Sequence, residues 1–377
     1  MLTGPALTRF RKNLLAWFAQ FQRDLPWRRT REPYRIWLSE IMLQQTRVAA
    51  AIPYYERFLS RFPTVKALAE APEEEVLRLW SGLGYYSRAR NLQKAARAIV
   101  AKHGGEFPRT EEDARALPGI GAYTAAAILS IAYGEKLAVL DGNVARVVAR
   151  LDAIRGDLRA NGTWAKLQNT ANALLEGKSP GDWNQAMMEL GATLCTPRAP
   201  QCLLCPVSAF CEARKKGLAE EIPAKRAKRG TVVITLAALV LTDASGKTML
   251  LPPPKAAKKS VDAGDVPTLV SKMWHFPTIA VGKRAEEELR AFAEQRLFGG
   301  RKLAAELVPL KQVRHAVTYR AITVFPFLAR VVKLPKVTGA RVLLVENISE
   351  VAISNLTRKV GQEAATRVGL PFIDTRA

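Results

Sequence analysis

Two glycines one residue apart decide how this chain folds, in the stretch Leu117-Pro118-Gly119-Ile120-Gly121-Ala122-Tyr123-Thr124-Ala125. Apolar residues at helical spacing lie on both sides, so Gly119 and Gly121 are expected to form a tight turn between two helices. The second helix begins at this turn and leaves its first N–H groups free. The backbone of a nucleic acid is a natural ligand for such a helix start. For this motif alone, an ordinary corner between helices is the alternative.

Helical periodicity extends from this turn in both directions, as far as about Cys211. The expected helices are 7–21, 34–48, 54–62, 73–79, 87–101, 123–132, 144–151, 163–175 and 184–194. We expect Pro53, Pro63 and Pro72 to separate neighbouring helices, because proline is disfavoured in a helix interior. Short β-branched runs are scarce here, so this part is predicted to be an all-helical bundle.

The composition changes after Cys211. Seven basic residues face only two acidic ones between positions 214 and 229. This bias indicates an exposed linker, which either follows DNA or is a solvated tether. Later segments have the apolar pattern of four strands and one helix: 231–241, 248–251, 321–330, 341–345 and, for the helix, 285–297. A second, α/β domain is therefore expected from about residue 231.

Charge is the strongest signal in the composition. The 377 residues carry a formal net charge of +23 with 48% apolar residues, which indicates two or three folded domains. Clustered Lys and Arg gain free energy by displacing counterions from phosphates, so a nucleic acid is the expected partner. The longest apolar run, 232–241, is too short to cross a bilayer, and no secretory leader is evident. We therefore expect no membrane partner and a location in the cytoplasm.

All the cysteines of the chain, Cys195, Cys202, Cys205 and Cys211, lie close together in the sequence. Such clustering without a leader favours metal ligation over disulfides. The spacing C-x6-C-x2-C-x5-C contains one C-x2-C pair, whereas zinc ribbons usually contain two. One [4Fe–4S] cluster is therefore the favoured cofactor, with Zn²⁺ as the alternative.

Two acidic residues have surroundings that should shift their pKa values in opposite directions. Glu40 shares a helical face with Trp37 and Leu43, so burial is expected to raise its pKa. Asp141 directly precedes a helix, where amide donors and the helix dipole favour the ionised form. An acid and an anion together are what cleavage of a glycosidic bond requires. Taken singly, each has an ordinary explanation, as a surface residue and as a helix cap.

Six motifs together resemble the MutY family of the helix-hairpin-helix DNA glycosylase superfamily. They occur in the family's order over about residues 25–211, and their combination is far more specific than any one of them. The motifs are Leu25-Pro26-Trp27-Arg28, Ser39-Glu40-Ile41-Met42-Leu43-Gln44-Gln45-Thr46, Gly82-Leu83-Gly84-Tyr85-Tyr86-Ser87-Arg88-Ala89-Arg90, Leu117-Pro118-Gly119-Ile120-Gly121, Leu140-Asp141-Gly142-Asn143-Val144 and the four-cysteine spacing.

This resemblance implies a multidomain fold: an all-α helix-hairpin-helix glycosylase region with an iron–sulfur cluster loop, followed by an α/β Nudix-like domain. The implied boundaries are 1–212 for the glycosylase region, 213–230 for a basic linker and 231–372 for the Nudix-like domain. Within the first region, about 27–137 would form a six-helix subdomain, and about 1–26 with 138–212 a cluster-bearing subdomain. A monomer at the bacterial nucleoid is the expected state.

The resemblance also implies an activity. Enzymes of this family hydrolyse the N-glycosidic bond of adenine mispaired with 8-oxoguanine or guanine in double-stranded DNA, and leave an abasic site. Glu40 corresponds to the general acid that protonates the adenine. Asp141 corresponds to the carboxylate that stabilises or captures the sugar cation, with Asn143 supporting it and Tyr123 beside the sugar.

Further residues correspond to the family's contacts with the extruded base and the duplex. Those expected to line the adenine pocket are Trp27, Arg28, Leu43 and Gln185. Gln45 and Tyr85 would wedge into the duplex beside the mispair, which helps to offset the few kcal/mol that base extrusion costs.

Tyr123 separates this family from the related endonuclease III enzymes. Those carry a lysine at the matching position, whose amine attacks the sugar to form a Schiff base. Tyrosine cannot do so, and a monofunctional glycosylase is therefore expected. Two alternatives stay open: an endonuclease III-like pyrimidine glycosylase with lyase activity, and a non-catalytic, metal-stapled DNA-binding protein.

The C-terminal part is only weakly similar to the family's Nudix-like domain. It lacks the acidic box of pyrophosphohydrolases, so that activity is not expected. The family often has Phe-Ser-His after an Arg-His pair, whereas this chain has Arg314-His315-Ala316-Val317-Thr318-Tyr319. Thr318 keeps a hydroxyl able to bond 8-oxoguanine, while different residues flank it. A plain strand in a packed domain is the alternative for this stretch.

Overall fold

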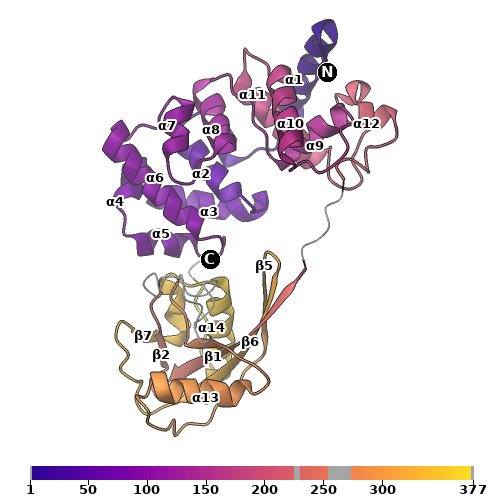
Figure 1. Ribbon diagram of the computed structural model, residues 1–377. Coiled ribbons are helices and arrows are strands. Elements are labelled where there is room, and N and C mark those ends of the chain that lie inside the picture. The colour runs from indigo at the N-terminus through magenta and orange to yellow at the C-terminus, as the bar shows by residue number, and fades with distance from the viewer. Residues whose placement is uncertain (1, 225–229, 254–272, 375–377) are drawn as a thin grey trace. The chain divides into compact units, whose positions relative to one another are not determined.

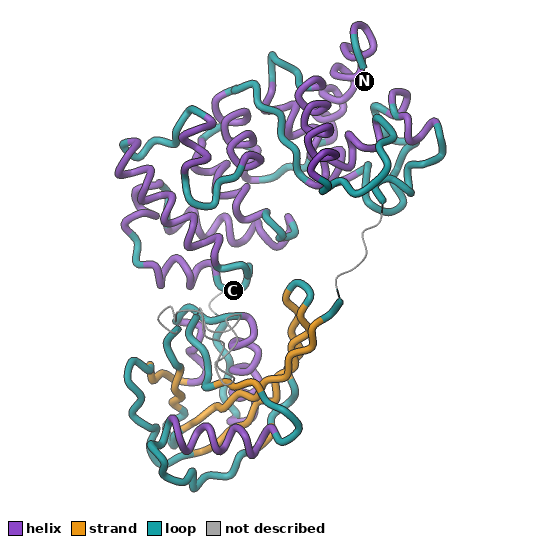
Figure 2. Tube along the Cα trace, viewed as in Figure 1, coloured by secondary structure: helices purple, strands orange, loops and turns teal. Residues whose placement is uncertain are grey.

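The computed structural model describes residues 2–224, 230–253 and 273–374, and the chain forms two compact units. The first unit comprises Met1–Glu70 and Asn91–Ala227, and the second Ala71–Arg90 and Lys228–Ala377 (Figure 1). In the described part of the chain, the first unit contains helices and loops, and the strands belong to the second (Figure 2). An all-helical first region and a second region with a sheet are thus confirmed.

Two predicted segments lie partly outside the described residues. The positions outside the described residues are 225–229 in the basic linker and 254–272 in the predicted Nudix-like domain. The division of the helical region into two subdomains stays a prediction. No helix in the described ranges combines the length and the apolar character needed to span a membrane.

The helices of the first unit follow the apolar periodicity of the sequence. They are α1 (Gly4–Phe21), η1 (Pro26–Arg28), α2 (Pro33–Leu43), α3 (Val48–Arg61), α4 (Val65–Glu70), α6 (Ser87–His103), α7 (Glu111–Ala116), α8 (Ala122–Ile128), η2 (Leu129–Tyr133), α9 (Gly142–Leu151), α10 (Asn161–Leu174), α11 (Pro180–Thr193), η3 (Ser208–Phe210) and α12 (Glu212–Lys215). The first residues of α6 belong to the second unit.

The structure corrects two helix predictions. The helix expected over 34–48 ends at Leu43, because Gln45 adopts a left-handed backbone with φ 59° in the turn that follows. Pro53 does not separate two helices but lies inside α3. Pro53 has no N–H to donate to the carbonyl of Ala49, four residues earlier. Ala49 is exposed, so water can donate to that carbonyl instead.

Packing between distant segments places α1 against α11. Phe10 on α1 and Trp183 on α11 are buried, with ring centroids 5.7 Å apart. The α2 helix is buried over most of its length and packs against α3 and α8. Both arrangements fix elements that line the site described below.

The second unit is built around a mixed sheet. Its elements are α5 (Glu73–Trp80), β1 (Val232–Thr242), β2 (Lys247–Leu250), β3 (Thr278–Ala280), α13 (Ala285–Arg296), β4 (Val308–Pro309), β5 (Val313–Val317), β6 (Arg320–Arg330), β7 (Arg341–Leu344), η4 (Val345–Glu350) and α14 (Asn355–Val368). The main strand order is β4-β6-β1-β2-β7, with β3 paired to β1 and β5 to β6. β1 and β6 are parallel, and the other pairs are antiparallel.

Successive residues of β1 face two different cores, which explains why its apolar run is continuous. Leu236 and Val240 lie in a core that includes Val360 of α14. Leu239 lies in a second core, which includes Leu289 of α13. One helix therefore covers each face of the sheet, and a strand buried on both faces needs apolar residues at every position.

Candidate active site

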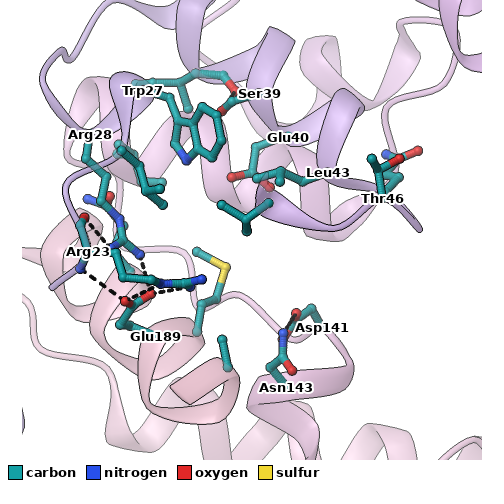
Figure 3. Close-up of a pocket in the computed structure, with 18 of the residues that line it drawn as sticks. Arg23, Trp27, Arg28, Ser39, Glu40, Leu43, Thr46, Asp141, Asn143 and Glu189 are labelled. Carbon is teal, nitrogen blue, oxygen red and sulfur yellow. Dashed lines mark hydrogen bonds and ion pairs between the residues drawn. The ribbon is translucent and has the colours of Figure 1, made fainter. Parts of the chain in front are cut away.

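One cavity of about 520 Å³ in the first unit brings most of the predicted site residues together. It is lined by nine of them: Trp27, Arg28, Glu40, Leu43, Gln45, Tyr123, Asp141, Asn143 and Gln185. Figure 3 shows Glu40 and Asp141 facing the cavity from separate elements, the first on α2 and the second just before α9. The two carboxyls, far apart in sequence, therefore meet at one site.

Glu40 is a buried carboxyl, with 7% of its surface exposed. The pKa of Glu40 is raised to about 7, mainly by burial, and the nearby negative charge of Asp141 contributes to this rise. The Tyr123 hydroxyl opposes this shift by donating to Glu40 Oε2 at 2.7 Å. The predicted rise in the pKa of Glu40 is confirmed, and a substantial fraction of this residue is neutral acid at physiological pH.

Asp141 caps the start of α9, as predicted. Its Oδ1 accepts from the backbone N–H of Val144 at 2.7 Å, and its Oδ2 accepts from Asn143 Nδ2 at 3.0 Å. The predicted direction of its pKa is wrong, however. Burial raises the pKa of Asp141 above its usual value, although these hydrogen bonds and the charge of Arg146 act to lower it. Arg146 also donates to Asn143 Oδ1 at 2.9 Å, which holds the amide in place.

Glu189 is a site residue that sequence reasoning missed. It accepts hydrogen bonds at 2.7 Å from both Arg23 and Arg28 on the cavity wall. Burial opposes ionisation, but these two guanidinium groups lower the pKa of Glu189 to about 2. A permanent carboxylate thus fixes the Arg28 side chain (Figure 3). Glu189 could have been predicted from its position four residues after Gln185, which places both side chains on the same face of α11.

Met188 was also missed. Its sulfur lies 3.3 Å from the Tyr123 hydroxyl and lines the same cavity. Met188 follows Gln185 by three residues, so it carried the same helical signal.

The glycine turn lies where the sequence places it, between α7 and α8. Gly119 has φ 82°, and a Cβ at this position would lie 2.9 Å from the Cβ of Asn91. Only glycine fits both the backbone and the space. Gly121 is the residue before α8, and a Cβ there would meet open space.

The other two residues predicted to contact the substrate, Tyr85 and Thr318, line another cavity of about 520 Å³, which belongs to the second unit. Tyr85 is exposed and has φ 49°, and Thr318 has φ 55°. Thr318 lies in the turn between β5 and β6, so the alternative of a plain strand is wrong at this residue. His315 and Asn355, which were not predicted, also line this cavity.

The four cysteines line one small cavity beside Arg150 and form no disulfide. Arg150 Nη1 donates to Cys195 Sγ at 3.2 Å, and backbone N–H groups of Val207 and Arg214 lie against the sulfurs of Cys205 and Cys211. Within the described ranges, no three or more His, Cys, Asp or Glu side chains are arranged as ligands of a single metal ion. All four cysteines nevertheless line the same cavity, and the Cys205 thiol lies close enough to the other three to interact with their charges.

Comparison with known proteins places these features in a family context. Residues 38–172 match the HhH-GPD superfamily, described as base excision DNA repair proteins. The chain is 36% identical to the human adenine DNA glycosylase over 415 aligned residues, which cover 96% of this chain and 76% of that protein. It is 49% identical to the rat adenine DNA glycosylase over 219 residues, covering 56% of this chain and 42% of that protein.

Among solved structures, the chain is similar to a thermostable thymine-DNA glycosylase. The TM-score is 0.52 at 31% identity, and the match covers 56% of this chain and 97% of the other. An endonuclease III trapped in a covalent intermediate with DNA has a TM-score of 0.50 at 24% identity, over 58% of this chain and the whole of that one. The second likeness concerns the fold of the helical unit alone.

Proposed function

Because the chain belongs to the adenine DNA glycosylases of the HhH-GPD superfamily, we propose that it hydrolyses the N-glycosidic bond of adenine mispaired with 8-oxoguanine or guanine in double-stranded DNA, leaving an abasic site. The observation that carries this proposal is the single cavity onto which Glu40 and Asp141 converge. A pocket with an acid and an anion matches the demands of glycosidic cleavage.

In this proposal Glu40 is the general acid. A pKa of about 7 lets Glu40 hold a proton near neutral pH and give it to the departing adenine. Asp141, held by Asn143, stabilises the positive charge that develops on the sugar or bonds to it. Tyr123 lies beside the sugar and orients Glu40 through their hydrogen bond.

The extruded adenine would occupy the cavity between Trp27, Arg28, Leu43 and Gln185. The ion pair of Arg28 with Glu189 supports this placement, because it fixes the guanidinium on the wall of the cavity. Gly119 and Gly121 would contact the DNA backbone, and Gln45 and Tyr85 would enter the stack where the base leaves it.

We assign the chain as a monofunctional glycosylase. Among the described residues that line the cavity there is no lysine, and tyrosine at position 123 cannot form a Schiff base. An endonuclease III-like lyase predicts the opposite: an abundant covalent adduct with DNA after borohydride treatment, which disappears when a lysine is replaced.

Recognition of 8-oxoguanine is assigned to the second unit, in a Nudix-like domain. The support is the cavity that Tyr85 and Thr318 share, and the left-handed backbone of both residues. Strained backbone of this kind persists where the surrounding structure holds it, and is frequent at binding sites.

The four cysteines would hold a [4Fe–4S] cluster. The sulfurs surround one cavity and receive N–H groups from the backbone and from Arg150, as the thiolates of such a cluster do. When bound, the cluster would cross-link the loop 195–211 and order it for contact with DNA.

The direct test is base release from short duplexes that differ only in the targeted base and in the base opposite it. We expect release of adenine opposite 8-oxoguanine and guanine, with thymine and cytosine left intact. Release of a pyrimidine, or no release of adenine from either mispair, would overturn the proposed function.

A further inference from the structure

A segment from the middle of the chain belongs to the second unit. Residues 71–90 cluster with 228–377, although about 140 residues separate them in sequence. On the surface, Glu74 is joined to Arg341 and accepts from Trp274 Nε1 at 3.1 Å. This pair is partly exposed, so it contributes little to holding the segment.

The buried link is made by Arg358 of α14. Arg358 is 2% exposed, and its Nη2 donates to Ser81 Oγ at 2.8 Å. Its Nη1 donates to Ser349 Oγ at 2.7 Å and to Asp374 Oδ1 at 2.8 Å. A buried cation needs such partners, and the planar fork of arginine can serve several acceptors at once. One charged side chain thus joins three segments.

Ser81 and its neighbours fix the turn that leads to Tyr85. The Ser81 hydroxyl donates to the carbonyl of Ile353 at 2.7 Å, and Asn355 Nδ2 donates to the carbonyl of Gly82 at 3.0 Å. Within the turn, Trp80 Nε1 donates to the carbonyl of Gly84 at 3.1 Å. The Ser81 hydroxyl and the Gly82 carbonyl are therefore bonded to Ile353 and Asn355, at the start of α14.

The turn that Arg358 holds faces the cavity shared with Thr318. Gly82, Gly84, Tyr85 and Thr318 all line that cavity. Tyr85 and Thr318 each have a left-handed backbone, which costs about 1 kcal/mol or more for a residue with a side chain. A change in the orientation of the Tyr85 turn or the Thr318 turn would therefore change the shape of the cavity.

We propose that Arg358 is a positioning residue for the choice of the base opposite the adenine. Through Ser81 it holds the Tyr85 turn at a fixed distance from the Thr318 turn, so that the cavity between them fits 8-oxoguanine. The inference rests on the proposed function. It adds that contacts from α14 determine the position of Tyr85, the residue proposed to wedge into the duplex. Arg358 itself does not contact DNA.

Two serine substitutions separate positioning from general stability. Ser81→Ala and Ser349→Ala each remove one buried hydroxyl from Arg358, at residues 2% and 1% exposed. Only the first breaks the link to the Tyr85 turn. The measurement is the single-turnover rate of adenine release opposite 8-oxoguanine divided by the rate opposite guanine, with the melting temperature of each variant recorded.

We expect Ser81→Ala to lower this ratio about tenfold, the size of one lost hydrogen bond to a charged group, mainly by slowing release opposite 8-oxoguanine. Ser349→Ala should leave the ratio within about twofold, since its bond does not reach the turn. If Ser81→Ala fails to fold, Ser81→Cys replaces it, because a thiol keeps the side-chain size but accepts the Arg358 hydrogen bond only weakly, and a fall of the ratio in the same direction is expected.

Two results would overturn the inference: an unchanged ratio in Ser81→Ala, or equal falls in both serine variants. A parent protein that releases adenine at equal rates from both duplexes also overturns it, because there is then no choice to position. Failure of the parent to release adenine at all would instead overturn the proposed function, so the two failures are distinct.

Discussion

The hydrogen bond between Tyr123 and Glu40 makes the two oxygens of the Glu40 carboxyl inequivalent. Tyr123 donates to Oε2, so in the proposed mechanism Oε1 is the oxygen that carries the proton for the adenine. The same bond stabilises the ionised form of Glu40 and so keeps its pKa at about 7, lower than burial alone would set it. Tyr123 thereby tunes the acid as well as orienting it.

Replacing Tyr123 with Phe tests this tuning. The hydroxyl lowers the pKa of Glu40, so its loss should raise that pKa. In the proposed mechanism the protonated form is the active one, so the rate of adenine release should fall as pH rises through the pKa. We expect the midpoint of this fall to move from near 7 to higher pH by about one unit. A midpoint that stays in place or moves to lower pH would contradict this role.

The raised pKa of Glu40 also has a consequence for stability. Its usual value is 4.5 and its value in the folded protein is about 7. The folded state therefore binds more protons between these values, and the contribution of Glu40 to stability is lost as pH rises through about 7.

Glu40→Gln removes this dependence. The free energy of unfolding of the variant, relative to that of the parent, should rise by roughly 2 to 3 kcal/mol between pH 5 and pH 8. Urea titration at the two pH values measures this change. If the stability difference between variant and parent is the same at both pH values, the carboxyl does not titrate in the assumed range.

Residue-scale predictions from the sequence succeeded where the cause is local. The burial of Glu40 follows from Ile36, Trp37 and Leu43 on its own helix. The pKa of Asp141 was misjudged because its helix cap is local, whereas the burial that outweighs the cap comes from the walls of the cavity. Those walls come from segments that no local pattern brings together.

At the scale of elements, the glycine turn before α8 depends on close approach as well as on backbone freedom. Gly119 has a left-handed backbone, and the side chain of Asn91 on α6 occupies the space that a Cβ would need. The turn is therefore fixed by tertiary packing, and a substitution there moves the start of α8.

Gly119→Ala should reduce both stability and affinity for duplex DNA. Gly105 is the matched control, because it has φ 89° but open space around its Cβ. Alanine at either site costs about 1–2 kcal/mol for the backbone, and only Gly119→Ala adds the clash with Asn91. We expect weaker DNA binding in Gly119→Ala alone, measured by titration of a fluorescent duplex. Equal binding in both variants would argue against a role of this turn in DNA contact.

Elements with strong periodicity were predicted well, and others were missed for identifiable reasons. The strand β1 differs from its predicted bounds by one residue at each end, and β6 by one residue at its start. The α14 helix was missed although Leu356, Val360 and Ala364 recur at four-residue spacing, because small and polar residues surround them. The β5 strand was missed because its five residues, VRHAV, alternate in burial but not in polarity.

At the scale of the whole molecule, contacts between distant segments form both cavities. Glu40 and Asp141 are about 100 residues apart, and Ser81 and Arg358 are 277 residues apart. The surroundings of Glu40 and Asp141 indicated the first pair and the family resemblance assigned both to one site, whereas nothing in the sequence indicated the second pair. Convergence of this kind depends on tertiary packing, which single-sequence patterns do not encode.

The cysteine loop offers a test at this scale. A bound [4Fe–4S] cluster should give brown protein with broad visible absorption. Cys202→Ala should lose that absorption and lower the melting temperature by about 5 °C or more, because cluster binding and folding are coupled. Leu204→Ala, an exposed change in the same loop, is the control and should keep both properties. Colourless parent protein containing zinc would contradict the cluster.

The most direct measurement is the single-turnover rate of adenine release from a duplex with adenine opposite 8-oxoguanine, for the parent, Glu40→Gln and Asp141→Asn. Asp152→Asn, at the other end of α9, is the control for loss of a carboxylate from that region. We predict that both active-site variants bind the duplex within about threefold of the parent and release adenine at least about 100-fold more slowly. Release by either variant at the parental rate would contradict the assignment of acid and anion to this pair.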